Sequence, residues 1–367
     1  MNEDIPVEQE SPSGVASYKS HNKRKILFLI VLLCSLVVLS FITLNIDLRY
    51  ISYGEMFRVI FDRNNPNNNI ISDILIWDLY IPRILSGILA GFALGIAGAV
   101  MQCVLRNPLA SPYTLGVSNA AAFGASMGIV LLGGGAILGQ SIVTIDISNP
   151  YIVTISAFFW AMVATMIIVV LVKVTKVSSE AMVLAGVAVS SIFAAGISLL
   201  QYIYNDMALS AIVFWQFGSL GKANWDQLTL IFVVLIACVI YFFYKRWDFN
   251  ALDTGDDTAR SLGVDTNSLR ITTLILSAVL TAVVVSFMGV IGFVGLLGPH
   301  IVRRILGNDN RYVLIGSMIV GALVLVIADC FGQNIADFTI PVGIITSFLG
   351  GPIFIYILIR SYRRTST

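Results

Sequence analysis

The chain has 367 residues, of which 57% are hydrophobic and only 12% are charged. An ordinary soluble domain carries about 25% charged residues, so this composition cannot cover a soluble surface. The 22 basic and 21 acidic residues leave a net charge of +1. A nucleic-acid-binding protein needs a clustered basic face, so that class is excluded, and a chain surrounded largely by a lipid bilayer is favoured.

The first 25 residues form a polar tail that ends in Lys23, Arg24 and Lys25. The apolar run that follows, 26–44, is longer than the core of a signal peptide and predicts a first membrane-spanning helix. A hydrocarbon core requires about 20 apolar residues per helix. By this measure further spans are predicted at 82–104, 114–133, 151–172, 181–203, 228–244, 271–289, 291–304, 313–331 and 341–360.

Ten uniformly apolar spans predict an all-α polytopic membrane protein, because barrel strands, the other structure stable in lipid, alternate in polarity. The membrane domain is predicted over 26–361, with a short tail at 362–367. If the N-terminus is cytoplasmic, 17 of the 22 lysines and arginines lie on the cytoplasmic side and five lie outside. The positive-inside rule therefore places both termini on the cytoplasmic side of the cell membrane.

Two segments on the predicted outer side are too polar to span. The segment 45–80 begins with an amphipathic stretch that predicts a short interfacial helix, followed by a flexible turn that includes the asparagine-rich run 64–69. The segment 204–227 carries Trp215 and Trp225 and predicts a second interfacial helix.

The longest cytoplasmic loop, about 248–270, has the pattern of a folded element. Thr254 or Asp253 can cap a helix that begins with Asp256 and Asp257 and stops at Gly263. The apolar face of this helix consists of Leu252, Ala259 and Leu262. A solvated linker is the alternative, but the pattern is more regular than a linker needs. A docking element for a cytoplasmic partner is therefore favoured.

Two glycine-rich segments, 95–109 and 289–303, each run into a polar break marked by proline. On the predicted topology they have opposite orientations, which predicts an inverted repeat of the kind found in transport folds. Two sets of glycines recur at helical spacing: Gly87, Gly91 and Gly95, and Gly289, Gly292, Gly295 and Gly298. We expect both sets to allow close helix packing or a break rather than to contact a ligand.

The residue patterns of a membrane enzyme are not found. His300 has no partner histidine at metal-ligand spacing, and the four cysteines are widely separated, so we expect no catalytic residue, metal site or cofactor in this chain. The nearest match to a phosphate-binding loop, 218–222, lacks the first glycine and the final Ser/Thr. Ionisable residues within spans are rare, Asp329 and Arg106 being the main cases, which disfavours a transporter driven by ions or protons.

Several motifs follow one another from about residue 80 to residue 360. They include Arg106-Asn-Pro-Leu-Ala-Ser-Pro112, Leu115-Gly-Val-Ser-Asn119, Thr258-Ala-Arg-Ser-Leu-Gly263, Pro299-His-Ile301 and Pro341-Val-Gly-Ile-Ile-Thr346. With these motifs the chain resembles the FecCD-type permease subunits of ABC importers for iron-siderophores, haem and cobalamin. The resemblance implies a cobalamin-importer-permease-like fold of ten helices. It also implies a homodimer or close heterodimer around a central pathway, and an ATPase docked between spans six and seven.

By this resemblance the loop at 248–270 is the ATPase-coupling segment. The coupling residues that it implies are Gly255, Asp256, Asp257, Ala259, Arg260, Leu262 and Gly263. Asp256 stands where the family often has glutamate, so the acidic role is kept with a shorter reach. On the outer face Arg83 matches a position where permease arginines pair with carboxylates of a substrate-binding protein, whereas Tyr80 and Gln333 stand where relatives can have arginine.

The predicted function is that of the permease subunit of a binding-protein-dependent ABC importer for an iron-siderophore, haem or cobalamin-type metal chelate. ATP is expected to be used by a partner subunit, which moves 253–264 as a lever. Spans five and ten then switch the access of the pathway, and Ser190, Ser191 and Ser198 are predicted to line it. Two alternatives stay open: an ion-gradient-driven secondary transporter, and an ABC importer permease for a small oxyanion such as molybdate.

Overall fold

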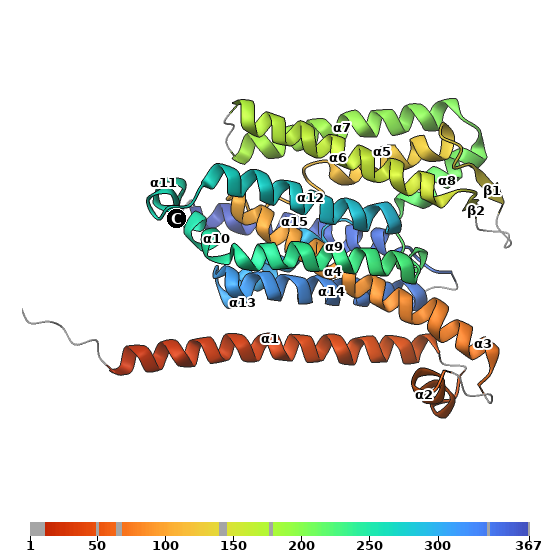
Figure 1. Cartoon of the computed structure of the whole chain (residues 1–367), viewed down its shortest axis with the longest axis horizontal. Helices are drawn as coiled ribbons and strands as arrows, with labels where there is room; N and C mark the ends of the chain where they lie inside the picture. The colour runs from red at the N-terminus through yellow and green to blue at the C-terminus, as the bar shows by residue number, and fades with distance from the viewer. Residues whose placement is uncertain are drawn as a thin grey trace, which may run out of the picture.

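The computed structural model describes residues 12–48, 51–63, 68–138, 145–175, 179–335 and 338–365. Within these ranges the regular elements are helices, except for an antiparallel hairpin formed by β1 (Ala136–Leu138) and β2 (Ile145–Ile147). The longer helices lie side by side as one bundle (Figure 1). The predicted all-α polytopic fold is therefore confirmed, with the hairpin as a small addition.

Each predicted span corresponds to one helix. In chain order these are α1 (Pro12–Asp47), α4 (Ile81–Val104), α5 (Val117–Val130), α6 (Pro150–Thr175), α7 (Ser179–Ile203), α9 (Trp225–Tyr244), α12 (Thr266–Met288), α13 (Val294–Leu306), α14 (Asn310–Asn334) and α15 (Val342–Thr365). In the part of the chain that the structure describes, seven helices are long and apolar enough to cross a membrane. Of the ten helices that correspond to predicted spans, α5, α13 and α15 are not among these seven.

Two of these three helices, α5 and α13, have only 14 and 13 residues. At 1.5 Å per residue each is about 20 Å long, against a hydrocarbon core of about 30 Å. Their spans are completed by the irregular segments 105–116 and 289–293. Non-helical backbone is stable at membrane depth only where protein surrounds it. The packing around these two segments is therefore a requirement of the fold.

The shorter helices flank the spans. Helices α2 (Tyr53–Phe61) and α8 (Asp206–Gln216) lie where the two interfacial helices were predicted. Residues 70–80 are not a flexible turn, because α3 (Ile70–Asp73) and the π-helical η1 (Ile74–Tyr80) run directly into α4. The side chain of Asn69 caps the start of this helix, because it accepts a hydrogen bond from the amide of Ile71 at 3.0 Å. The predicted turn falls largely on 64–67, outside the described residues.

Helix α4 lies at the centre of the bundle and packs against α14, α13, α12 and α9. Glycine makes this packing possible. A Cβ atom placed on Gly91 would overlap the backbone of Ala322, and one placed on Gly95 would overlap the carbonyl of Ser317. The prediction that Gly91 and Gly95 allow close helix packing is confirmed, since the two backbones touch with no side chain between them.

The break between α12 and α13 is formed by residues with left-handed backbone. Gly289 has φ of +80° and Phe293 has φ of +65°. Only glycine adopts this conformation without cost, so Phe293 must be held by its surroundings. Its ring lies 5.7 Å from that of Tyr113 and 6.4 Å from that of Phe354. A Cβ atom on Gly350 would overlap the Phe293 side chain, so α15 needs glycine at this contact.

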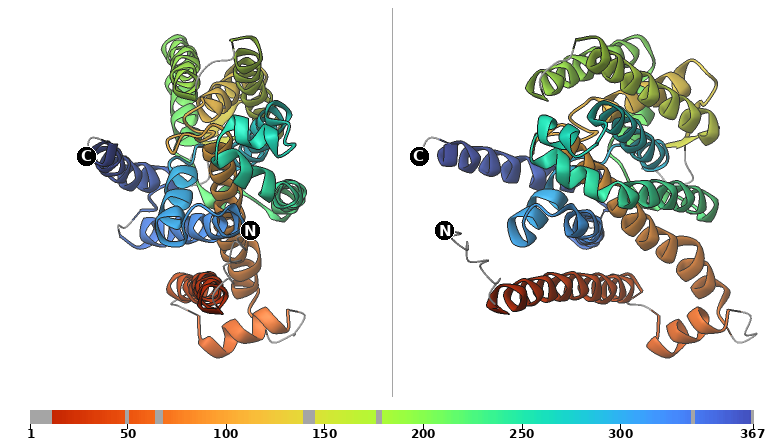
Figure 2. Two further views of the ribbon diagram at one scale, coloured as in Figure 1. Left: turned by 90° about the vertical axis from the view of Figure 1, so that its left-hand side faces the viewer. Right: turned by 60° about the vertical axis from the view of Figure 1, so that its left-hand side comes forward.

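Several helices leave large apolar side chains uncovered. Helix α1 lies at the edge of the bundle, mainly against α14, and α15 projects away from the other helices (Figure 2). Val37 on α1 is 63% exposed, Ile192 on α7 is 70% exposed, and Phe348 on α15 is 81% exposed. Such faces are stable next to lipid tails or against a second protein, but not in water.

Gly95→Ala is expected to lower the unfolding temperature of the detergent-solubilised protein, because the added methyl group overlaps the Ser317 carbonyl and forces α4 and α14 apart. Overpacking of this kind costs about 1–3 kcal/mol. Gly54→Ala is the matched control, since its Cβ would meet nothing closer than the Ser52 Oγ at 4.0 Å. An unchanged unfolding temperature for Gly95→Ala would contradict the backbone contact.

Candidate functional site

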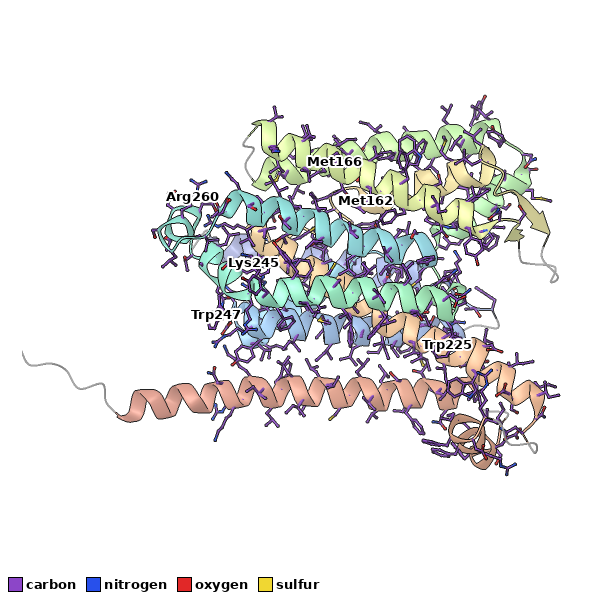
Figure 3. All side chains as sticks on the ribbon, viewed as in Figure 1. Met162, Met166, Trp225, Lys245, Trp247 and Arg260 are labelled. Carbon is purple, nitrogen blue, oxygen red and sulfur yellow. The ribbon has the colours of Figure 1, made fainter. Side chains whose placement is uncertain are left out.

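The two ends of the bundle differ in their polar elements. One end carries α10 (Arg246–Asp253) and α11 (Asp256–Ser261), and we call it the α11 end. The opposite end carries α2, α3 and the β hairpin, and we call it the α2 end. Figure 3 shows Lys245, Trp247 and Arg260 at the α11 end and Trp225 toward the other.

The loop predicted at 248–270 folds into α10, α11 and the first turn of α12. Helix α11 begins at Asp256 and ends before Gly263, as predicted. Gly263 has φ of +85°, and its amide donates to the Arg260 carbonyl at 2.9 Å. A glycine with left-handed backbone after the last turn is the usual end of a helix.

The predicted cap of α11 is wrong. Gly255, with φ of +129°, occupies the N-cap position and supplies no side chain. Thr254 donates its hydroxyl to the Ala251 carbonyl at 2.7 Å, and Asp253 is the last residue of α10. The physical reason is that residues 246–253 form a separate helix, so Asp253 and Thr254 belong to the end of that helix.

The inner side of α11 is tied to two membrane helices through Asp256. Its carboxylate accepts two hydrogen bonds from Nη2 of Arg270, at 3.2 and 3.3 Å, and lies 3.9 Å from Nη1 of Arg106. The Nε of Arg270, on α12, donates to the carbonyl of Val104 at 2.8 Å. Val104 is the last residue of α4, so a cation sits at the negative end of that helix. Ala259 completes the inner side and is fully buried.

The outer side of α11 is largely exposed. Asp257, Arg260 and Gly263 are exposed, and Leu262 is 67% exposed. The Nε of Arg260 bonds to the hydroxyl of Thr266 at 3.2 Å, which orients the side chain without burying it. An exposed leucine between charged residues adds little to the packing of its own chain, but it suits a partner that covers it.

The seven predicted coupling residues therefore differ in their surroundings. Asp256 and Ala259 face the bundle and Gly255 lies at the N-cap of α11, whereas the other four present its outer side. At the base of α10, Lys245 donates to the carboxylate of Asp248 at 2.8 Å. This hydrogen bond raises the pKa of Lys245 above its ordinary value.

Arg83 lies in the first turn of α4, at the α2 end. Its Nε and Nη2 donate to the two carboxylate oxygens of Asp329 at 2.8 and 3.0 Å. The two side chains are only 13% and 5% exposed, and Gln333 donates a further bond to Asp329 at 2.9 Å. The guanidinium predicted to contact a binding protein thus joins α4 to α14 within the chain. The docking role stays a prediction.

The sequence reasoning missed this ion pair, although both residues stood out as charges at the ends of apolar spans. A signal for the pair was available. Charged side chains near the membrane are costly unless they are paired, so a lone arginine and a lone aspartate on the same predicted side are natural partners. Arg83 and Asp329 are 246 positions apart in the chain, so no local pattern links them.

The three predicted pathway serines do not share one environment. Ser191 and Ser198 lie seven positions apart on the exposed face of α7, where each hydroxyl donates to a carbonyl of its own helix. Ser190 is turned toward Gly116, before the start of α5. In the described part of the chain, no group of three or more His, Cys, Asp or Glu residues could hold a metal ion.

These features, a bundle of apolar helices with a polar folded element at one end, are those of a multi-pass membrane protein. The chain belongs to the FecCD transport family, whose model it matches over residues 32–360. The Methanocaldococcus jannaschii protein MJ0087, described as an ABC transporter permease, is 45% identical over 349 residues, covering 95% of this chain and 98% of that protein. The hemin transport system permease protein HmuU of Yersinia pestis is 32% identical over 341 residues, covering 91% and 96%.

Solved structures show the same similarity. A structure described as an inward-facing conformation of a metal-chelate-type ABC transporter is 28% identical to this chain, with a TM-score of 0.75. The match covers 91% of this chain and 99% of the other. The helical permease fold predicted from the sequence is thereby confirmed.

Asp329→Ala is expected to destabilise the protein strongly, because it leaves the Arg83 guanidinium largely buried without its carboxylate. Breaking a buried ion pair costs about 3–5 kcal/mol, whereas replacing both partners with apolar residues is often neutral. Thermal unfolding in detergent should therefore show a large loss for Asp329→Ala and a clear recovery in the double variant Arg83→Leu/Asp329→Leu. Equal losses in the two variants would refute an ion pair between the two side chains.

Proposed function

We propose that this chain is the permease subunit of a binding-protein-dependent ABC importer. The observation that carries the proposal is the α10–α11 element, which is bonded to α4 and α12 on its inner side and presents Leu262 on its outer side. Membership of the FecCD transport family supports it. The names of HmuU and of the metal-chelate-type transporter favour an iron-siderophore, haem or cobalamin-type chelate as the substrate.

In this proposal the α11 end faces the cytoplasm, as do both termini. The ends of α1, α9, α13 and α15 that lie at the α11 end carry Lys23–Lys25, Lys245–Arg246, Arg303–Arg304 and Arg363–Arg364. This is the distribution that the positive-inside rule demands of cytoplasmic loops. The α2 end then faces the outside.

ATP is hydrolysed in this proposal by a separate cytoplasmic subunit that covers the outer side of α11. Movement of α11 reaches α12 and the end of α4 through Asp256, because Arg270 bonds to both Asp256 and the carbonyl of Val104. A second permease copy completes a central pathway. Ser191 and Ser198, on the uncovered face of α7, then line that pathway beside α15.

A substrate-binding protein docks at the α2 end in this scheme. We expect Arg83 to exchange its two bonds to Asp329 for a contact with a carboxylate of that protein. Gln333 donates to the same Asp329 carboxylate and stays as its partner after the exchange. Docking would then loosen the link between α4 and α14 at this end.

Leu262→Glu is expected to abolish co-purification of the permease with its ATPase subunit, because a charge replaces the exposed apolar side chain at the C-terminal end of α11. Losing an apolar anchor of a protein–protein interface costs about 2 kcal/mol or more. Asn267→Glu is the matched control, since it adds the same charge at an exposed position in the first turn of α12. Full association of Leu262→Glu would refute docking on this surface.

Uptake by proteoliposomes separates the three transport hypotheses. With the binding protein, labelled ferric siderophore, hemin or cobalamin should accumulate only when the ATPase subunit and ATP are present, and an ionophore should have no effect. Uptake without the ATPase that an ionophore abolishes would instead indicate a secondary transporter. ATP-dependent uptake of labelled molybdate, without uptake of the chelates, would support the oxyanion alternative.

A further inference from the structure

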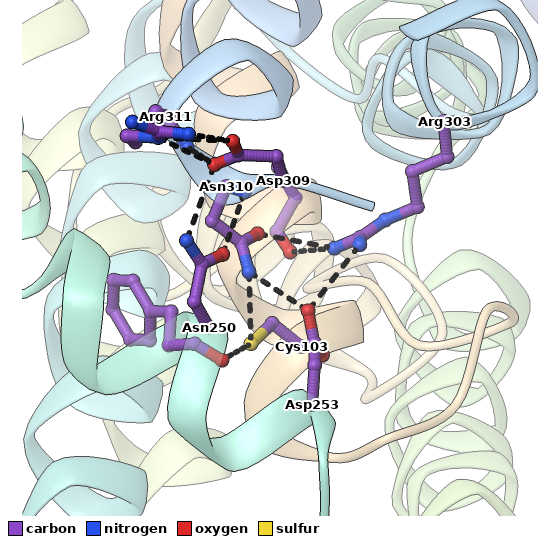
Figure 4. Close-up of polar contacts among 9 residues, drawn as sticks. Cys103, Asn250, Asp253, Arg303, Asp309, Asn310 and Arg311 are labelled. Atoms are coloured by element: carbon purple, nitrogen blue, oxygen red, sulfur yellow. Dashed lines mark hydrogen bonds and ion pairs between the residues drawn. The ribbon is translucent and has the colours of Figure 1, made fainter. Parts of the chain in front are cut away.

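A second polar cluster joins α10, which belongs to the coupling segment, to the start of α14 (Figure 4). It includes none of the seven predicted coupling residues. Helix α10 turns two side chains toward the start of α14. Asn250 accepts the backbone amide of Asn310 at 2.8 Å and donates to the carboxylate of Asp309 at 3.1 Å. Asp253 accepts a hydrogen bond from the side-chain amide of Asn310 at 2.8 Å. Asn310 is thus bonded to α10 through both its main chain and its side chain.

Asn310 also connects to α13 and α4. The side-chain oxygen of Asn310 accepts a hydrogen bond from Nη2 of Arg303, on α13, at 3.5 Å. Nη2 of Arg303 also donates to the carbonyl of Ala99, on α4, at 3.3 Å. Nη1 of Arg303 lies 3.7 Å from the Asp253 carboxylate. A primary amide both donates and accepts, so Asn310 bridges this aspartate and this arginine in a way that neither a carboxylate nor an ammonium group can.

The cluster is shielded from water at its centre. Asn310 is fully buried, whereas the side chains of Arg303 and Asp253 are 17% and 25% exposed. Losing a buried hydrogen-bond partner leaves the remaining group unsatisfied, so the bonds of Asn310 are costly to break one at a time. We therefore expect the residues of the cluster to move together, because breaking their hydrogen bonds costs more free energy than moving them as one group.

Asp309 links the cluster to α14, because it bonds to Asn250 and is the N-cap residue of that helix. Its side chain accepts the amide of Arg311 at 3.0 Å and so caps the helix. Burial raises the pKa of Asp309, but hydrogen bonds from Arg311 and Asn250 outweigh that effect and lower the pKa below its ordinary value. The cap therefore stays ionised, which favours the N-terminus of α14.

The far end of α14 carries Asp329, which is paired with Arg83 at the α2 end. A continuous helix joins Asn310 to Asp329, and at 1.5 Å per residue this length is about 29 Å. Because a helix bends little over such a length, a displacement applied at Asn310 reaches the opposite end of the bundle. The Asp256 contacts described above lead instead to α12 and the end of α4.

We propose that Asn310 is a positioning residue that transmits movement of the coupling segment to α13 and α14. The inference rests on the proposed importer function. When the ATPase displaces α10, Asn250 and Asp253 carry Asn310 with them, and α14 follows as a rigid helix. Asn310 itself contacts neither ATP nor substrate.

The test uses the permease–ATPase complex in lipid nanodiscs, with Cys34 and Cys330 replaced by serine and a spin label attached at Asn334→Cys, at the α2 end of α14. The distance between the labels of the two permease copies is measured without nucleotide and with ATP plus vanadate. We expect the parental complex to change distance on trapping. Asn310→Ala should lose this change while keeping ATP hydrolysis, whereas the exposed-site control Asn267→Ala should keep both.

A purely structural role is separated by an exchange variant. Asp253→Asn/Asn310→Asp keeps the volume, the net charge and the hydrogen bond, with donor and acceptor exchanged. It should restore the distance change that Asn310→Ala loses. The proposal is overturned if Asn310→Ala keeps the full distance change, or if the exchange variant fails to assemble or to restore it. A parental complex that binds no ATPase would instead refute the importer function itself.

Discussion

The structure depends on the contact between the backbones of α4 and α14. Gly91 and Gly95 remove the side chains that would separate the two helices, so the main chains touch near the middle of the bundle. Both ends of α4 then carry a polar link: Arg83 to α14 at the α2 end, and the Val104 carbonyl to Arg270 at the α11 end. Lipid supplies no hydrophobic force between helices, so this packing and these few charge pairs hold the bundle together.

The charged residues near the membrane are used in pairs at the ends of helices. Asp256 with Arg270 and Asp253 with Arg303 lie at the α11 end, and the two arginines belong to two different membrane helices, α12 and α13. Each pair is only partly exposed, so screening by water is limited. A small element of two short helices can therefore be held firmly to the bundle while its outer side stays open to a partner.

Much of the fold could be predicted from the sequence because spans are defined by length and polarity alone. The order of ten helices, the start of α11 at Asp256 and the packing role of Gly91 and Gly95 follow from local patterns. The pairing of Arg83 with Asp329 and the cluster around Asn310 could not be predicted, because each joins residues far apart in the chain. A single asparagine in a sequence carries no sign of the helices that surround it.

The short helices α5 and α13 have a mechanical consequence. Helix α7 has 25 residues, yet α5, against which it packs, has 14. Helix α7 also contacts α6, α8 and the irregular segment 105–116, where a Cβ atom on Gly186 would overlap the Thr114 carbonyl. The segment 289–293 supports α15 in the same way through Phe293 and Gly350. Part of the surface that supports α7 and α15 is thus irregular backbone rather than helix, so we expect these two helices to move more readily than α4 and α14.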